Sequence, residues 1–375
     1  MKAFLKLISL FVLLIFTVGC NATSGVVSLG VSGDGRYVIT AHGKDELVLW
    51  DIVKKEKKLL AKNANSYSAY FIPDSHEFMW QDTDNVVHIQ NVNGEELRQF
   101  PHFETEGHVI TSDKSFYLSA DKWGKLYKGY GDNLIPVYTD APISPLQPYN
   151  LSIHGNYILS TGNGRESNKG YVAETNLTVN PVNPDIHKRD SYQGVTLWDK
   201  TTLKPIARLY GNSGRTTGRI SPDGKWVVTG SDNARTYMWA INNPNQRIRL
   251  SGLNGIFDKK TQTRDTSRLL PIPEKFHEIQ VAKLSYVLAV AFLTDKDFIL
   301  FDRNAKDRIH PIYTTGDVWI QGYVDLGKRK SISQSNLSIG SSPKAHILVI
   351  SQGSGIAVYR YHPETKELEK IWVAD

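Results

Sequence analysis

The chain has 375 residues, and its 44 Lys and Arg against 38 Asp and Glu give a formal net charge of +6. Hydrophobic residues make up 40% of it, and Gly (29), Tyr (18) and Trp (8) are plentiful, which is typical of a large, turn-rich β protein. The basic residues are scattered along the chain, which argues against nucleic acid as a partner. With one cysteine, no internal disulfide can form, so a large core must stabilise the fold.

The N-terminus has the layout of a secretory signal. It reads MKAFLKLISLFVLLIFTVGC, with Lys2 and Lys6 before an apolar run at 7–18 and the small Gly19 after it. A membrane-spanning helix needs about 20 apolar residues, and this run is shorter. An uncleaved membrane anchor or plain secretion is therefore the alternative.

Cys20, directly behind this run, makes the segment resemble a bacterial lipoprotein signal. The resemblance implies that residues 1–19 are removed, that Cys20 is lipidated, and that residues 20–25 form a short tether. Removing 1–19 deletes two lysines and lowers the net charge from +6 to +4. The implied address is the bacterial cell envelope, lipid-anchored and facing the periplasm. By the same resemblance, Asn21 favours the outer over the inner membrane.

The rest of the chain repeats one pattern. Residues 37–51 read YVITAHGKDELVLWD and residues 226–240 read WVVTGSDNARTYMWA. Each is an apolar strand, a polar turn and a second strand ending in Trp, and an Asp-Gly turn precedes each, at 32–36 and 221–225. A third copy is split, with its second strand at 157–162 and its third at 194–199. Weaker copies follow at 84–92, 125–130, 297–303 and 355–361.

These units resemble WD40 repeats of the β-propeller family. The resemblance is strongest in LWD at 49–51 and 197–199, and in SPDGKWVVTGSDN at 221–233. The Gly-His pair that opens such repeats is missing from the strongest copies, and Gly211-Asn212 stands in its place before the unit at 221–240. The hydrogen-bonded tetrad of the family is therefore expected to be incomplete.

The resemblance implies an all-β fold, a β-propeller of four-stranded antiparallel blades over residues 26–375. At roughly 40–45 residues per blade, and with two insertions, we predict seven blades, with six or eight as alternatives. The predicted bounds are 26–62, 63–102, 103–140, 141–210, 211–253, 270–314 and 315–375. The residues expected to have structural roles in the blades are Trp50, Asp51, Trp198, Asp199, Thr229 and Trp239. For the tryptophans, including Trp226, sugar stacking is the alternative.

Motifs for catalysis or cofactor binding are missing. No nucleophile elbow, zinc-protease, dinucleotide or phosphate-loop motif occurs. We therefore predict no catalytic residue, no metal and no cofactor, and expect that the chain is not an enzyme. His102 and His108 are interpreted as exposed loop histidines, with a metal site as the alternative.

Two charged groups also have structural interpretations. Asp82, Asp84 and Asp232 lie between predicted strands, where Asp caps turns, and calcium binding is the alternative. The KKEKK run at 54–58 is interpreted as a solvated turn, and contact with anionic lipid is the alternative.

Two insertions interrupt the repeats, at 163–193 within the fourth blade and at 254–275 between the fifth and sixth. Long loops without structure of their own are often functional, although both could be surface loops without a partner. Second-to-third-strand turns and blade connections open on the same face, so we expect both insertions around the mouth of the channel. Apolar residues within these polar segments are the candidate partner-binding residues: Tyr171, Val172, Ile256, Phe257, Leu269 and Leu270.

The sequence thus favours a lipid-anchored, non-catalytic propeller that serves as a protein-interaction platform in the bacterial envelope. Its expected partners are the membrane, through the N-terminal lipid, and another envelope protein. The alternatives are an exported enzyme or small-ligand binder that uses the central channel, and a purely structural envelope protein. Because an innermost strand is predicted to start at Val26, close behind Cys20, the insertions are expected near the bilayer.

Overall fold

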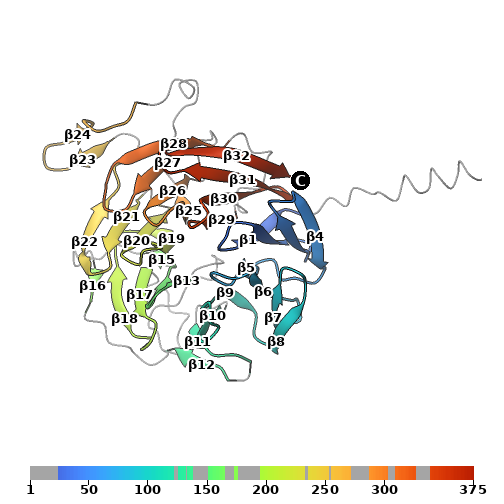
Figure 1. Ribbon diagram of the computed structural model, residues 1–375. Helices are drawn as coiled ribbons and strands as arrows, with labels where there is room; N and C mark the ends of the chain where they lie inside the picture. The colour runs from blue at the N-terminus through green and yellow to red at the C-terminus, as the bar shows by residue number, and fades with distance from the viewer. Residues whose placement is uncertain are drawn as a thin grey trace, which may run out of the picture.

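The computed structural model describes residues 24–121, 126–131, 133–137, 151–164, 173–175, 195–232, 235–252, 255–271, 287–302, 309–326 and 338–375. Within them, the strands form seven antiparallel blades of four main strands each, arranged in a ring (Figure 1). The all-β propeller and its blade number are therefore as predicted. No helix in these ranges is long and apolar enough to cross a membrane.

The first three blades follow the chain without interruption. Blade 1 contains β1 (Val26–Val31), β2 (Tyr37–His42), β3 (Leu47–Asp51) and β4 (Glu56–Ala61). Blade 2 contains β5 (Tyr70–Phe71), β6 (Glu77–Gln81), β7 (Val86–Asn91) and β8 (Glu96–Pro101). Blade 3 contains β9 (Thr105–Ile110), β10 (Tyr117–Asp121), β11 (Leu126–Lys128) and β12 (Ile135–Val137).

The next two blades include short strands from the first insertion. Blade 4 contains β13 (Leu151–His154), β14 (Tyr157–Ser160), β17 (Val195–Asp199) and β18 (Pro205–Leu209), with β16 (Ala173–Glu174) paired to β18. Blade 5 contains β19 (Gly214–Ile220), β20 (Trp226–Ser231), β21 (Tyr237–Ala240) and β22 (Asn243–Arg249), with β15 (Asn163–Gly164) paired to β19. The split third repeat is confirmed, because β14 and β17 are hydrogen-bonded neighbours.

The last two blades differ from their predicted bounds. Blade 6 contains β25 (Val287–Phe292), β26 (Asp297–Asp302), β27 (Ile309–Thr314) and β28 (Ile320–Asp325). Blade 7 contains β29 (Ile339–Ser342), β30 (Ile347–Gln352), β31 (Gly355–His362) and β32 (Glu367–Ala374). The predicted ranges 270–314 and 315–375 are wrong because β28 pairs with β27 and completes blade 6.

The Asp-Gly turns repeat the same hydrogen bonds in different blades. In blade 1, the Asp34 carboxylate accepts from the Ser32 hydroxyl (2.6 Å) and from the N–H of Arg36 (3.1 Å). In blade 5, Asp223 accepts in the same way from Ser221 (2.5 Å) and Lys225 (3.1 Å). These side chains satisfy turn donors, so the repeated sequence makes a repeated turn.

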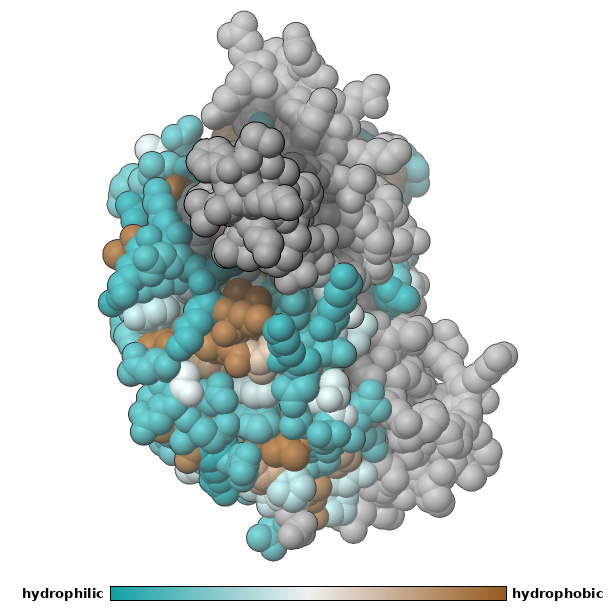
Figure 2. Space-filling view, turned by 90° about the vertical axis from the view of Figure 1, so that its right-hand side faces the viewer, coloured by the Kyte–Doolittle hydropathy of each residue, from teal (hydrophilic) through white to brown (hydrophobic). Residues whose placement is uncertain are grey.

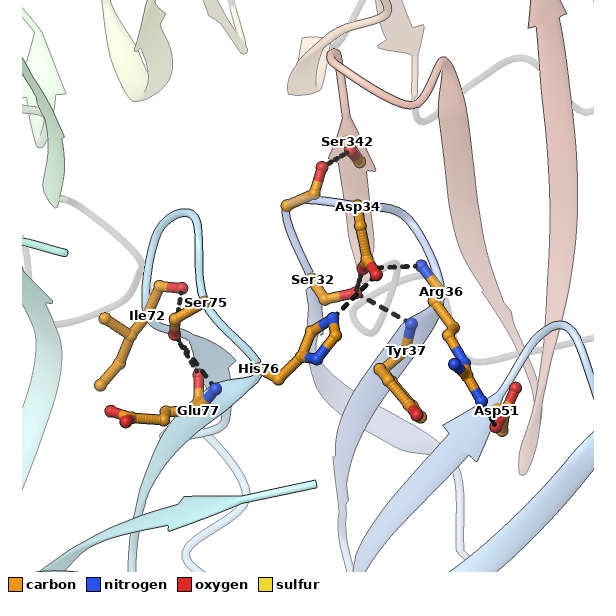
Figure 3. A network of polar contacts seen from close by, with 11 residues as sticks. Ser32, Asp34, Arg36, Tyr37, Asp51, Ile72, Ser75, His76, Glu77 and Ser342 are labelled. Atoms are coloured by element: carbon orange, nitrogen blue, oxygen red, sulfur yellow. Dashed lines mark hydrogen bonds and ion pairs between the residues drawn. The ribbon is translucent and has the colours of Figure 1, made fainter. Parts of the chain in front are cut away.

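The blade 1 turn also touches both neighbouring blades (Figure 3). His76 of blade 2 bonds the Asp34 carboxylate through Nε2 at 2.8 Å. The hydroxyl of Ser342 in blade 7 donates to the carbonyl of Gly33 at 2.5 Å. The polar turn therefore helps to set the position of one blade against the next.

Seven apolar clusters hold the ring together, one between each pair of adjacent blades in the described residues. Trp50 (1% exposed) packs between blades 7 and 1, Trp198 (3%) between 3 and 4, and Trp239 (0%) between 4 and 5. Trp226 is half-buried against the cluster of blades 5 and 6. The tryptophans are thus packing residues, since their rings are covered by the neighbouring sheet.

The ring closes without strand exchange. Blade 1 consists entirely of the first four described strands, and blade 7 of the last four. Closure rests on the apolar cluster between these blades and on backbone contacts such as Val26 N–H to the carbonyl of Gly353, at 2.9 Å. The apolar cluster that contains Val26, Trp50 and Val358 therefore contributes to closing the ring.

The tetrad is incomplete, as the missing Gly-His pairs predict. In blade 1 the Trp50 indole N–H donates to the Thr40 hydroxyl (2.9 Å), and Thr40 bonds His42 Nε2 (2.9 Å). In blade 5 the Thr229 hydroxyl donates to Asn212 (2.6 Å), but the buried indole N–H of Trp239 has no partner. Asn212 thus replaces the histidine without completing the network.

Candidate functional site

The Asp residues that follow Trp50 and Trp198 cap turns. The Asp51 carboxylate accepts from the N–H groups of Val53 (3.0 Å) and Lys54 (3.1 Å) and pairs with Arg36 (3.1 Å). Asp199 accepts from the N–H of Thr202 at 2.7 Å. These hydrogen bonds lower the pKa of Asp199. Asp51 and Asp199 therefore have a structural role, since their carboxylates accept hydrogen bonds from the turns that follow them.

His102 and His108 are not the exposed loop residues that the sequence predicts. His108 lies on β9, is 8% exposed, and bonds the Tyr117 hydroxyl (3.3 Å) and the Ser68 carbonyl (3.1 Å). Burial lowers its pKa to about 3. His102 is half-buried and bonds Ser119 at 3.0 Å, and burial lowers its pKa to about 4. Both are neutral histidines that hold blades 2 and 3 together.

The acidic residues act mainly in turns. Asp82 accepts from the N–H groups of Asp84 (3.0 Å) and Val86 (2.7 Å), which confirms the capping interpretation there. Asp232 accepts from the N–H of Arg215 at 3.3 Å. In the described part of the chain, no group of three or more His, Cys, Asp and Glu could hold a metal.

The second insertion forms a β-hairpin outside the ring. β23 (Ile256–Asp258) pairs with β24 (Thr263–Asp265), and the hairpin projects beyond β28 and β22 (Figure 1). Gly255 allows this turn at the base, since it has φ 79 and a side chain there would collide with the carbonyl of Asp265 at 2.2 Å. Residues 255–265 of the insertion therefore form an ordered hairpin, which the sequence did not predict.

Its position corrects the expectation of a loop at the channel mouth. After β22 ends, the Ser251 N–H donates to the carbonyl of Val318 at 2.9 Å, in the turn between β27 and β28. The connection thus leaves from the outer edge of the ring. In blade 1 the outermost strand likewise contacts the third-to-fourth-strand turn of the next blade, since Lys58 Nζ on β4 donates to the carbonyl of Asn93 (3.3 Å).

Contacts with blade 6 anchor the segment after β24. Arg268 pairs with Asp317 (2.9 Å) and lies over the Trp319 ring (5.5 Å). Burial alone would raise the pKa of Asp317, but hydrogen bonds from Trp319 N–H and Arg268 lower it. The Tyr323 hydroxyl donates to the carbonyl of Leu270 at 3.4 Å. No sequence pattern predicts these anchors, because Arg268 and Asp317 lie 49 residues apart.

The apolar candidates divide into two groups. Phe257 is 41% exposed on β23 and Leu270 is 38% exposed beside blade 6, whereas Ile256 and Leu269 are half-buried. The Arg264 guanidinium lies over the Phe257 ring at 5.2 Å. Tyr171 and Val172 lie outside the described residues, as does Cys20. The exposed aromatic ring with a cation beside it is the kind of group that anchors protein interfaces.

The comparisons with known proteins agree with the fold. The chain is 23% identical over 277 residues to the APC/C activator protein CDH1 of Saccharomyces cerevisiae, covering 65% of this chain and 47% of that protein. It is 23% identical over 236 residues to the guanine nucleotide-binding protein subunit beta of the same organism, covering 55% and 54%. The chain thus spans about half the length of each relative. No protein-family model matches it. The two matches and the seven-bladed ring together support a propeller of the WD40 type.

Proposed function

We propose that this protein is a non-catalytic WD40-type propeller, anchored in the bacterial cell envelope by a lipid on Cys20, on which another envelope protein docks. The main supporting observation is the β23–β24 hairpin. It projects from a closed, rigid ring and exposes Phe257 within a polar segment. A rigid ring with a variable loop at its edge is a common way to build a recognition surface.

Two further findings support a binding role. One matched relative is named an activator protein and the other a subunit, and both names describe proteins that act together with others. The hairpin is also attached to blade 6 by the Arg268–Asp317 pair, so that little conformational entropy is lost when a partner binds. The lipid anchor follows from the position of Cys20 behind a short apolar run, and the outer membrane remains the favoured location.

Co-purification tests the docking surface. Affinity-tagged full-length chain is recovered from cells after crosslinking, in a Phe257→Ser variant and in a matched Leu97→Ser variant. Leu97 is 42% exposed, almost the same as Phe257, but lies on β8 in blade 2. We expect Phe257→Ser to reduce the captured partner at least tenfold, as for an interface anchor, and Leu97→Ser to leave it unchanged. Equal capture by both variants would show that the hairpin is not the docking surface.

The anchor has its own test. The intact mass of the mature protein should show that residues 1–19 are absent and that Cys20 has gained a lipid. Cys20→Ser should shift the protein to the soluble fraction or leave it unprocessed. A mature wild-type mass that still includes residues 1–19 contradicts the anchor, whatever the outcome for the hairpin.

A further inference from the structure

One side of the ring combines exposed apolar residues with lysines. Val53, in the turn between β3 and β4, is 71% exposed, the highest value for a large hydrophobic side chain among the described residues. Leu59 on β4 is 45% exposed and Val373 near the end of β32 is 46% exposed. Figure 2 looks at this side of the molecule and shows apolar residues set among hydrophilic ones.

The structure brings these residues together where blades 7 and 1 meet. The rings of Trp50 and Trp372 make an edge contact, with centroids 6.1 Å apart. Lys57 lies over the Trp50 ring (5.3 Å) and donates to the oxygen of Asp375 (2.5 Å). The end of β32 therefore lies against β3 and β4. We name the surface formed by Val53, Lys54, Lys55, Lys57, Lys58, Leu59 and Val373 the seam wall.

The seam wall carries a local excess of positive charge. The run at 54–58 contains four lysines and one acid, Glu56. The sequence predicts a turn there, but Lys57 and Lys58 lie on the outermost strand β4, and only Lys54 and Lys55 are in the turn. Lys58 donates to a carbonyl group, and neither Lys54 nor Lys55 forms an ion pair in the described part of the chain. Lysines around exposed apolar groups suit the surface of an anionic bilayer.

The four-residue tether from Cys20 to Ser24 is long enough to reach this side of the ring. The first described residue is Ser24, and β1, two residues later, is the innermost strand of blade 1. From β1 to β4 there are three strand spacings, about 14 Å in all. Cys20 precedes Ser24 by four residues, which span at most about 14 Å. A lipid on Cys20 can therefore enter a membrane on which the seam wall lies.

We propose that the seam wall rests on the anionic lipid surface in which the Cys20 lipid is embedded. This inference depends on the lipid anchor of the proposed function. It reverses the expectation that the insertions lie beside the bilayer, because the β23–β24 hairpin is on the opposite side of the ring from β4 (Figure 1). The hairpin then points away from the membrane, toward a partner in the aqueous compartment.

Position-specific quenching tests the orientation. A fluorescent amino acid is placed in the full-length chain at position 56 on β4, or at position 262 in the hairpin turn. The purified protein is reconstituted in phosphatidylcholine vesicles, with or without phosphatidylglycerol, that contain a nitroxide-labelled lipid. In anionic vesicles we expect strong quenching at position 56 and little at position 262. Raising the salt concentration from about 0.1 M to about 1 M should abolish most of the quenching at position 56, since the Debye length falls from about 10 Å to about 3 Å.

Two matched double variants test whether the lysines of the seam wall, rather than the total charge of the protein, drive binding to the anionic surface. Lys54→Gln/Lys55→Gln should lower the ratio of docked to undocked protein about thirtyfold, which corresponds to about 1 kcal/mol per lysine. The control Lys259→Gln/Lys260→Gln changes two exposed turn lysines in the hairpin and should change this ratio less than twofold.

Several results overturn the inference. They are no quenching at position 56, stronger quenching at position 262, or equal quenching at position 56 in vesicles without phosphatidylglycerol. A photocrosslinker at position 56 that captures a protein in cells, with no quenching in vesicles, makes the seam wall a protein interface. The intact mass of the protein distinguishes a failure of the proposed lipid anchor from a failure of this inference. An unlipidated Cys20 contradicts the proposed anchor, whereas a lipidated Cys20 with position 56 unquenched contradicts this inference alone.

Discussion

Replacing Trp50 and Trp239 separately by phenylalanine tests how the blades are stabilised. Both side chains are fully buried between blades, at 1% and 0% exposure, so the loss of apolar contact is similar. They differ in one group. The indole N–H of Trp50 donates to the Thr40 hydroxyl at 2.9 Å, and that of Trp239 has no partner. The two substitutions should therefore cost different amounts of stability.

The difference can be worked out from hydrogen bonding alone. Trp50→Phe removes a bond with a net value of about 1 kcal/mol, and Thr40 keeps its bond to His42. Trp239→Phe removes a buried unpaired donor, which costs the native state about 1–3 kcal/mol. Trp50→Phe should thus lower the free energy of unfolding by about 2–4 kcal/mol more than Trp239→Phe.

Guanidinium unfolding of the full-length variants, followed by far-UV circular dichroism, measures this difference. Circular dichroism is preferred because each substitution removes one of the eight tryptophans and so changes the fluorescence signal. If the slope with denaturant is unchanged, the midpoints report stability directly. Equal midpoints, or a lower midpoint for Trp239→Phe, would refute the reasoning from the tetrad.

Three further predictions concern stability. Gly30→Ala should cost about 1–3 kcal/mol in thermal or chemical unfolding, because a Cβ there would lie 2.6 Å from the Cα of Tyr70 in the next blade. The pKa of His108 is lowered to about 3 from an ordinary 6.5, so the unfolded chain binds its proton first. The stabilisation by neutral His108 is complete above pH 6.5 and decreases as the pH falls toward 3. Between pH 7 and 5 the free energy of unfolding should therefore fall by about 2 kcal/mol more in the wild type than in His108→Gln, and equal decreases would exclude this histidine as the cause. Arg268→Gln should change global stability by no more than about 1 kcal/mol, since its pair with Asp317 is largely exposed, yet it should accelerate limited proteolysis between residues 255 and 271, and an unchanged digestion rate would contradict the anchoring role.

The strong repeats could be predicted because each has its structural information within fifteen residues. The turn at 32–36 and the strands that end at Trp50 follow from local hydrogen bonding and alternation. The same turn chemistry occurs in blade 3, where Asp113 accepts from the Thr111 hydroxyl (2.5 Å) and the Ser115 N–H (3.0 Å). This turn was not predicted, because the third strand of blade 3, β11, does not end in tryptophan as β3 and β17 nearly do.

The wrong predictions concern features that depend on pairing between residues far apart in the sequence. The apolar segment at 355–361 reads equally well as any strand of a blade, and only its pairing with β30 and β32 makes it the third. For blade 6 the same ambiguity displaced both predicted bounds. His108 looked like a loop residue after a glycine, but its partner Ser68 lies 40 residues away.

The partner-binding residues remain a prediction. Of the apolar residues in polar segments that the sequence singled out, Phe257 and Leu270 are exposed. The hairpin itself, its place at the outer edge of the ring and its attachment through Arg268 were not predicted. They depend on how β22 ends against the next blade, which is a property of the assembled ring.

The most direct test of the proposed platform is photocrosslinking in intact cells from the hairpin. A photoreactive amino acid replaces Phe257 in one strain and Leu97 in another, and adducts are identified by mass spectrometry. The account predicts one dominant protein adduct from position 257 and none of that partner from position 97. No protein adduct from position 257, or the same adducts from both positions, would contradict the claim that this propeller binds its partner through the hairpin.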